Sequence, residues 1–474
     1  MCQSQITRRG FFVGCSAAIA SLAGSRFNSL AFAAPGSWSN DEILVVCFLR
    51  GGQDGLNLVV PTGGATNDRQ YYDQARPQIS ITAAEANQRP LGSLSGTSFG
   101  FHPAMAPLYD LYQADKLSIA MACGMAANER SHFDSMNWIE LGTPGLSSTT
   151  SGWLTRHLQT ANNLPETIVM PSLSVGSLQP VSLLASYETI NMSSPDAFSL
   201  STGPWAWRNA QRVALRNLYQ SNSTFVHTAG LQALDAVDIV ELYASGTYTP
   251  RPGSNYPDTW FGDNLQTIAQ MVKLDLGLRI ATLDLGGWDT HENQGTTAGV
   301  YGALAGELAQ GLRALWHDLD DTTSYVGKLT LVVMSEFGRR VEENFDNGTD
   351  HGHGNNLLVM SGHATGGLHG VWPGLHPDQL ADGDVQVTTD FRRVLSEILV
   401  RRLGNPRVDL VFPGYAGYSP LGVVTGQDLP VGADVIFADD YDSGSTGRWD
   451  GTTGGLANAR ATSRAGREPE RRPC

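Results

Sequence analysis

Ile43–Leu49 (ILVVCFL) is an uninterrupted apolar run that ends at Arg50-Gly51-Gly52. A run with no alternating polar residues is typical of a strand that is buried on both faces, as in a parallel sheet. Similar runs recur along the chain and predict four more strands, at Leu117–Cys123, Ile280–Leu285, Leu329–Met334 and Leu357–Met360.

Segments with helical patterns alternate with these runs. Between the third and fourth strands, leucines recur at helical spacing from Leu304 to Leu319, and a final helix is expected after a Thr389 or Asp390 cap. The alternation predicts an α/β fold with a doubly wound, mostly parallel sheet and helices on both faces. The pattern is less regular over residues 145–275, which we interpret as an insertion covering one side of the sheet within a domain spanning 34–425.

Composition and charge exclude several classes of protein. The 474 residues are 41% hydrophobic and 16% charged, which favours a folded chain. The net charge of −15 argues against general nucleic-acid binding, which needs a basic surface. No internal apolar run reaches the length of a transmembrane segment. Cys47 and Cys123 lie in apolar runs and are expected to be buried thiols, although a bridge between them stays an alternative.

Both ends of the chain differ in composition from its middle. Arg8-Arg9-Gly10-Phe11-Phe12 precedes a small-residue apolar stretch that ends in Ala31-Phe32-Ala33. This pattern predicts a twin-arginine signal peptide at 1–33, with an ordinary secretory signal as the alternative. The protein is therefore expected to interact with the twin-arginine export machinery and to be periplasmic or extracellular.

Residues 426–474 are acidic and then Arg-rich, which predicts a disordered tail.

Polar clusters follow the predicted strands, where open α/β sheets bind ligands. Asp289 and His291 lie in the Gly-rich loop after the third strand. Carboxylate and imidazole groups are ordinary ligands of divalent metal ions, so this pair is a candidate metal site. The alternative is an Asx turn beside an uninvolved histidine.

Glu336 comes directly after the fourth strand, in Ser335-Glu336-Phe337-Gly338-Arg339. A carboxylate at this edge of the sheet is either a metal ligand or the partner of Arg339. Arg339 and its neighbour Arg340 are placed to hold an anionic oxygen, or else to balance Glu342 and Glu343.

Two further clusters carry candidate ligands. Asp350, His351 and His353 lie among glycines at 348–354, a pattern that favours a metal site over a solvated loop. Asp54 follows the first strand in Gly-Gly-Gln-Asp-Gly and is either another ligand or a turn aspartate.

Ser131 has two interpretations. With Asp134 three residues later, it is typical of a helix N-cap. It is also placed to act as a nucleophile, because a helix N-terminus stabilises an alkoxide and a nearby metal lowers the pKa of the hydroxyl.

Six runs, taken in order, resemble the exported DUF1501 family over nearly the whole chain to about residue 425. They are VVCFLRGGQDGLN (45–57), FHPAMAPLYDLY (101–112), ERSHFDSM (129–136), LGGWDTHENQ (285–294), SEFGRRVEENFDNGTDHG (335–352) and GGLHG (366–370). The family is itself similar to the alkaline phosphatase and sulfatase superfamily, which implies an alkaline-phosphatase-like fold.

The wider resemblance implies a role for each matched residue. Ser131 matches the nucleophile position, Asp54 the first-strand aspartate ligand, and Asp289 with His291 a ligand pair, here at a shorter spacing. Glu336 matches the first member of an Asp-His pair whose histidine is Phe337 in this chain. The late histidine would be His351 or His353. Loss of one ligand to Phe337 makes one metal site a safer expectation than two.

The resulting hypothesis is a metal-dependent hydrolase of phosphate or sulfate esters, small or polymeric, with Ser131 as nucleophile and Arg130 or Arg339 steadying the charge. The cation would be Zn, Mn, Ca or Mg. The first alternative is a protein of the same fold that binds a metal or ligand in the cell envelope without turnover. The second is a structural exported protein whose polar loops only cap turns.

Overall fold

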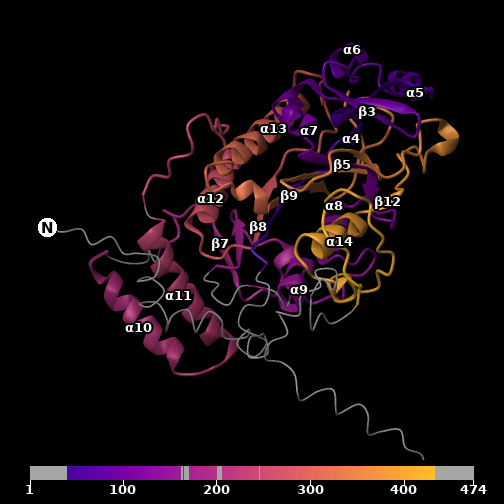
Figure 1. Cartoon of the computed structure of the whole chain (residues 1–474). Helices are drawn as coiled ribbons and strands as arrows, with labels where there is room; N and C mark the ends of the chain where they lie inside the picture. The colour runs from indigo at the N-terminus through magenta and orange to yellow at the C-terminus, as the bar shows by residue number, and fades with distance from the viewer. Residues whose placement is uncertain (1–39, 162–163, 165–169, 200–204, 245, 433–474) are drawn as a thin grey trace, which may run out of the picture.

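The computed structural model describes residues 40–432 except 162–163, 165–169, 200–204 and 245 (Figure 1). The predicted signal peptide at 1–33 and the predicted tail beyond 432 lie outside the described residues. In the part of the chain that the structure describes, we find no helix that is long and apolar enough to span a bilayer.

A nine-stranded sheet forms the centre, with the order β11-β5-β10-β9-β1-β8-β6-β7 and β12 paired to β5. Within the described part of the sheet, β10 is antiparallel to both of its neighbours and the other pairs are parallel. The predicted α/β fold with a mostly parallel sheet is thus confirmed. The strands are β1 (Ile43–Leu49), β5 (Leu117–Gly124), β6 (Ser172–Val175), β7 (Thr189–Met192), β8 (Ile280–Leu285), β9 (Leu329–Ser335), β10 (Asn355–Ser361), β11 (Gly367–His369) and β12 (Thr389–Asp390).

Helices cover both faces of this sheet, because its central strand is apolar on both sides. Val45 and Cys47 of β1 lie in one core, whereas Val46 and Phe48 lie in the other. Figure 1 shows α12 and α13 on one side of the sheet and α8 and α14 on the other. These helices are α8 (His132–Leu141), α9 (Trp153–Thr160), α12 (Trp260–Leu274), α13 (Val300–Leu319) and α14 (Phe391–Arg401).

The remaining elements are smaller or lie beside the main body. A three-stranded antiparallel sheet, β2-β4-β3, packs in the same core as α12 and α13. Helices α10 and α11 form a pair at the edge of the molecule (Figure 1). The bounds of these smaller or peripheral elements are β2 (Val59–Gly64), β3 (Pro90–Leu94), β4 (Thr97–Phe101), α4 (Gly55–Leu58), α5 (Asp68–Ala75), α6 (Ala83–Ala86), α7 (Tyr109–Gln113), α10 (Arg208–Gln220), α11 (Phe225–Tyr243) and α15 (Val408–Val411).

The structure differs from the expectation for residues 145–275. This stretch does more than cover one side of the sheet, because it supplies β6 and β7, which extend the sheet beyond β8. The sequence of β6, Ser-Leu-Ser-Val, is short and half polar and so lacks the apolar run that identified the central strands.

The two described cysteines are buried and unbridged, as expected for small apolar side chains in the core. Burial raises the pKa of both the Cys47 and Cys123 thiols, which keeps them protonated.

Candidate metal centre

The direction of the strands explains why distant loops meet at one edge of the sheet. Strands β5, β9, β1 and β8 run the same way, so their carboxyl ends share this edge. Because β10 runs the other way, it begins at the same edge. The loops after β8 and β9, the loop before β10 and the start of α8 therefore lie close together.

Three side chains form a possible metal-binding set there, and His291 lies beside them. Ligand atoms of His132, Asp289 and His351 lie within 4.8 Å of one another. The Nε2 atoms of His132 and His351 are each 3.3 Å from Asp289 Oδ1. His291 Nε2 lies 3.0 Å from the same oxygen and 2.8 Å from His351 Nε2. The sequence predicted three of the four residues, and the structure adds His132.

Each imidazole of this cluster contacts a hydrogen-bond acceptor through its other ring nitrogen. Since carboxylates and carbonyls only accept, Nδ1 is the donor in all three rings, and a neutral ring then has its lone pair on Nε2. The acceptors are Glu336 Oε1 for His132 at 2.8 Å, Asp350 Oδ1 for His291 at 3.0 Å, and the Arg130 carbonyl for His351 at 2.7 Å. This arrangement of partners is typical of histidines that bind a metal ion.

The inward-facing atoms suit a cation. The Nε2 atoms of three imidazoles meet around one carboxylate oxygen, and in the neutral rings such nitrogens can bind a cation. His132 Nε2 is buried and has no hydrogen-bond partner among the described residues. Tetrahedral ligands with bonds of about 2.0–2.1 Å lie about 3.3 Å apart. The distances of 3.0 to 3.3 Å from Asp289 Oδ1 to the three Nε2 atoms are close to that value.

The protonation states also suit a cation. Burial alone would raise the pKa of Asp289, but the hydrogen bond and charge of Arg339, together with the two nearby histidines, outweigh it and lower this pKa to about 2. Hydrogen bonds, the first of them from His132, likewise outweigh burial at Glu336 and lower its pKa. Burial lowers the pKa of His351, which keeps that imidazole neutral. Both carboxylates are therefore ionised at neutral pH.

Arg339 positions Asp289 and has no free group for a substrate. Its buried guanidinium donates to Asp289 Oδ1 at 2.6 Å and to the Thr349 carbonyl at 2.7 Å. It also donates to the carbonyls of Gly51 and Gly52. Arg339 therefore takes neither of its two expected roles, which were holding an anionic oxygen and balancing Glu342 and Glu343. Instead, its hydrogen bonds join three loops.

Glycines allow these loops to approach closely. Gly51 has a φ of +120°, and a Cβ there would lie 2.4 Å from the Asp289 backbone nitrogen. A Cβ at Gly348 would lie 2.2 Å from the His291 carbonyl oxygen. A larger residue at either position would push an aspartate or a histidine out of the cluster.

Asp54 does not reach the cluster, and its expected role as a ligand is corrected. It is fully buried and forms an ion pair with Arg76, with its Oδ2 2.6 Å from Arg76 Nη1. Arg76 Nη2 also contacts Asp54 Oδ1 at 3.1 Å, and Gln294 donates to Oδ2 at 2.7 Å. The Asp54 carboxylate thus binds the Arg76 guanidinium and not a metal ion.

Three other predicted ligands lie outside the inner group. His353 is directed away, with Nε2 2.7 Å from the Met125 carbonyl. Glu336 and Asp350 are partners of the histidines, as described above, and Glu336 also accepts from the Gly51 backbone nitrogen at 2.8 Å. These two carboxylates orient ligands and do not join them.

Ser131 is the N-cap of α8, and its hydroxyl accepts from the Asp134 backbone nitrogen at 3.4 Å. It directly precedes His132, which places it at the rim of the cluster. Arg130 pairs with the buried carboxylate of Asp384 and keeps 30% of its side chain exposed. The contact of this segment with the cluster is through the Arg130 carbonyl, which lies 2.7 Å from His351 Nδ1.

His132 was not predicted as a ligand, although the sequence around it contained a usable signal. His132 stands in the quoted run ERSHFDSM, but the N-cap pattern of Ser131 and Asp134 accounted for that segment without it. Phe337, which stands at an expected histidine position, packs its ring 4.9 Å from the rings of both His132 and His351. The Phe337 ring therefore supports these two imidazoles by apolar contact.

We expect Glu336→Gln to weaken cation binding by about 10- to 100-fold, as loss of a histidine's carboxylate partner does elsewhere. The hydrogen bond that His132 donates to Glu336 raises the pKa of His132, so the variant should also lower this pKa in the metal-free protein. Titration of the imidazole by NMR and calorimetry with Zn²⁺ would measure both effects. An unchanged His132 pKa would contradict the assignment.

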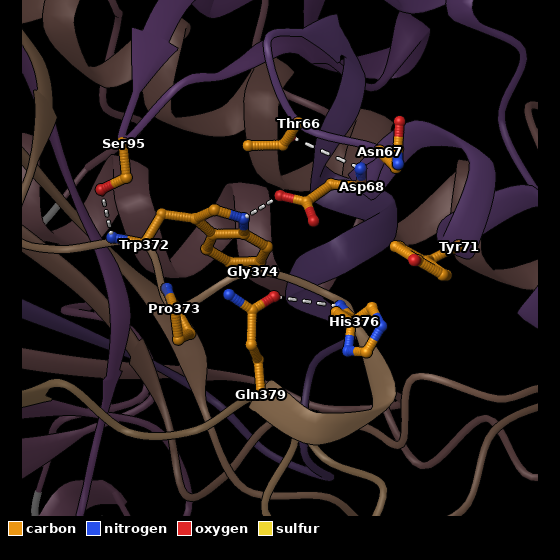
Figure 2. A pocket seen from close by; sticks show the side chains of 10 residues that line it. All are labelled: Thr66, Asn67, Asp68, Tyr71, Ser95, Trp372, Pro373, Gly374, His376 and Gln379. Carbon is orange, nitrogen blue, oxygen red and sulfur yellow. Dashed lines mark hydrogen bonds between the residues drawn. The ribbon is translucent and has the colours of Figure 1, made fainter.

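A cavity of about 420 Å³ lies elsewhere, between α5 and the loop at 372–379 (Figure 2). Figure 2 shows Asp68 among the residues that line it, and both oxygens of this carboxylate accept hydrogen bonds, from Trp372 Nε1 at 2.8 Å and from the Leu375 backbone nitrogen at 2.9 Å. The cavity shares no residue with the cluster, so the two are separate.

Comparison with known proteins adds a partial family match. The model of a family described as a protein of unknown function, DUF1501, matches residues 209–399. The matched range contains Asp289, His291 and His351 but ends short of the segment that carries His132. No curated protein matches the chain.

Proposed function

We propose that this protein is a metal-dependent hydrolase of phosphate or sulfate esters that uses a single cation bound by His132, Asp289, His291 and His351. The convergence of three Nε2 atoms on one carboxylate carries this proposal. An imidazole-rich set favours Zn²⁺, or next Mn²⁺, over the oxygen-preferring Ca²⁺ and Mg²⁺.

Exposure of the ligands favours a catalytic over a purely structural centre. Side-chain exposure is 20% for His132, 37% for His291 and 49% for Asp289. Structural zinc sites are closed, whereas catalytic sites keep a position open to water or substrate. A substrate can therefore reach this centre from solvent.

The chain's own groups would act as follows. Water cleaves the ester to an alcohol and inorganic phosphate or sulfate. A divalent cation, when bound, polarises the ester oxygen and lowers the pKa of a nearby hydroxyl. The Ser131 hydroxyl would attack phosphorus or sulfur from the N-terminus of α8, whose backbone N–H groups favour a negative oxygen. The bond to the alcohol oxygen breaks, the hydroxyl proton leaves with the alcohol, and the phosphate or sulfate group stays on Ser131. Water then hydrolyses this serine ester, which releases inorganic phosphate or sulfate and restores the hydroxyl. Arg339 holds Asp289 in place, and the exposed part of Arg130 steadies the anionic group.

Two accompanying proposals concern the fold family and the location. We propose an alkaline-phosphatase-like fold, which the carboxyl-edge position of the cluster supports. We also propose export by the twin-arginine route, which the Arg8-Arg9 segment supports. Fusion of residues 1–33 to a reporter, with Arg8 and Arg9 changed to lysine as control, tests the second.

Metal analysis of protein without an affinity tag, together with assays on aryl phosphates and aryl sulfates, tests the function. We expect a stoichiometric divalent cation and turnover that chelation removes and Zn²⁺ restores. A bound cation without hydrolysis of any ester would favour the non-catalytic alternative, supported by Phe337 at a ligand position. Absence of a cation would favour a structural protein.

Two substitutions at Ser131 separate its possible roles. Ser131→Ala removes both the hydroxyl and the helix cap, whereas Ser131→Asn keeps a capping side chain without the nucleophile. If the hydroxyl attacks the ester, both variants should lose at least about 100-fold in kcat, in line with typical contributions of catalytic groups. Retained turnover in Ser131→Asn would reduce Ser131 to a cap.

A further inference from the structure

Two phenylalanines that directly follow residues of the metal centre or of its supporting loop are almost fully exposed. Phe133, which directly follows His132, is 85% exposed, and Phe345 is 106% exposed. Phe345 directly follows Asn344, whose amide donates to the His291 carbonyl at 2.9 Å and to Asp350 Oδ1 at 3.1 Å. The two rings thus belong to the segments that hold opposite members of the cluster, His132 and His291.

These two rings are exceptions within their own loops. The other large apolar residues there are buried: Trp288 is 0% exposed and Phe337 is 2% exposed. Single exposed apolar residues are common on protein surfaces, but here both belong to the rim of one site. An aromatic ring in water gains most from contact with another apolar group, so the rim favours apolar ligands.

The charges of the same rim are acidic. Asp134 follows Phe133, Asp346 follows Phe345, and Glu292 follows His291, and all three are exposed. The Asp346 carbonyl accepts from the Asn293 backbone nitrogen at 2.9 Å, so the loops carrying Phe345 and Glu292 lie side by side. Negative charge on the organic part of a substrate would be repelled there.

We propose that the substrates are esters of an aromatic or aliphatic alcohol that carries no negative charge besides the ester group. This inference rests on the proposed hydrolase function. The cation and Arg130 take the phosphate or sulfate group, and the apolar alcohol packs against Phe133 and Phe345. Nucleotides and polysulfated sugars are poor candidates, because their organic part is anionic.

Binding of phosphonates, which cannot be hydrolysed, tests the inference independently of turnover. Calorimetry on zinc-loaded protein would compare phenylphosphonate, methylphosphonate and 4-carboxyphenylphosphonate. Burial of a phenyl group corresponds to about 10-fold tighter binding of phenylphosphonate than of methylphosphonate. The added carboxylate should cancel much of this gain.

Variants assign the preference to particular residues. Phe133→Ala with Phe345→Ala should bring phenylphosphonate down to the affinity of methylphosphonate. The control is Leu178→Ala, which removes an apolar side chain that is 82% exposed and lies outside the loops that carry the cluster, and it should change nothing. Asp134→Asn with Asp346→Asn should restore binding of the carboxylated probe.

Each outcome gives a distinct answer. Equal binding of phenylphosphonate and methylphosphonate, or a phenyl preference that survives loss of both phenylalanines, would overturn the inference and leave the hydrolase proposal intact. Binding of none of the three phosphonates would overturn both.

Discussion

Replacement of His351 by alanine is expected to remove the bound cation and to lower ester hydrolysis by more than about 100-fold. Even the partners of metal ligands change affinity by about 10- to 100-fold when they are lost, and a ligand itself should matter more. His351 is central, because its Nε2 contacts both Asp289 Oδ1 and His291 Nε2. Metal content per chain and kcat/KM measure the effect.

The matched control is His363→Ala. His363 also hydrogen-bonds a backbone carbonyl, that of Gly327 at 2.9 Å, but it lies away from the cluster. This variant should keep its cation and its turnover. Full metal content and full activity in His351→Ala would contradict the ligand set proposed for the centre.

Arg76→Met should lower the free energy of unfolding by about 3–5 kcal/mol, the usual cost of removing one member of a buried ion pair. Asp54 and Arg76 are both 0% exposed, so the substitution leaves a charged carboxylate without its partner in the core. Because neither residue is a ligand, variant protein that still folds should keep its cation. Urea denaturation and metal analysis measure the two effects.

Three further variants serve as controls for the Arg76→Met prediction. Arg313→Ala, which breaks an ion pair with Asp110 that is 32% and 57% exposed, should cost less than about 1 kcal/mol. Arg76→Met combined with Asp54→Leu should recover part of the loss, since it leaves no buried charge. If Asp54→Asn released the cation without destabilising the protein, Asp54 would be a ligand after all.

The central strands could be predicted from the sequence because burial on both faces leaves one unmistakable pattern. The expected bounds of Ile43–Leu49 and Ile280–Leu285 agree with β1 and β8. The direction of β10 could not be predicted, because a run buried on both faces reads the same in a parallel or an antiparallel pair. That direction matters, since it brings His351 to the edge where Asp289 lies.

The candidate site was predictable in part for a similar reason. The polar cluster after the third predicted strand identified Asp289 and His291, since the carboxyl ends of parallel strands meet. The acid and histidines among glycines at 348–354 identified His351. Asp54 was assigned wrongly because its partner, Arg76, follows it at no diagnostic spacing. Only tertiary structure distinguishes a carboxylate that faces a guanidinium from one that faces a cation.

The position of β10 between β5 and β9 also affects the order of events during synthesis. His132 is made long before His351, and the ribosome must release the chain beyond β10 before the sheet can bring them together. A cation that binds only the finished arrangement stabilises completed chains and not partial ones. Ion loading would then be a late maturation step, and it would mark the fully folded molecules that the proposed twin-arginine route carries.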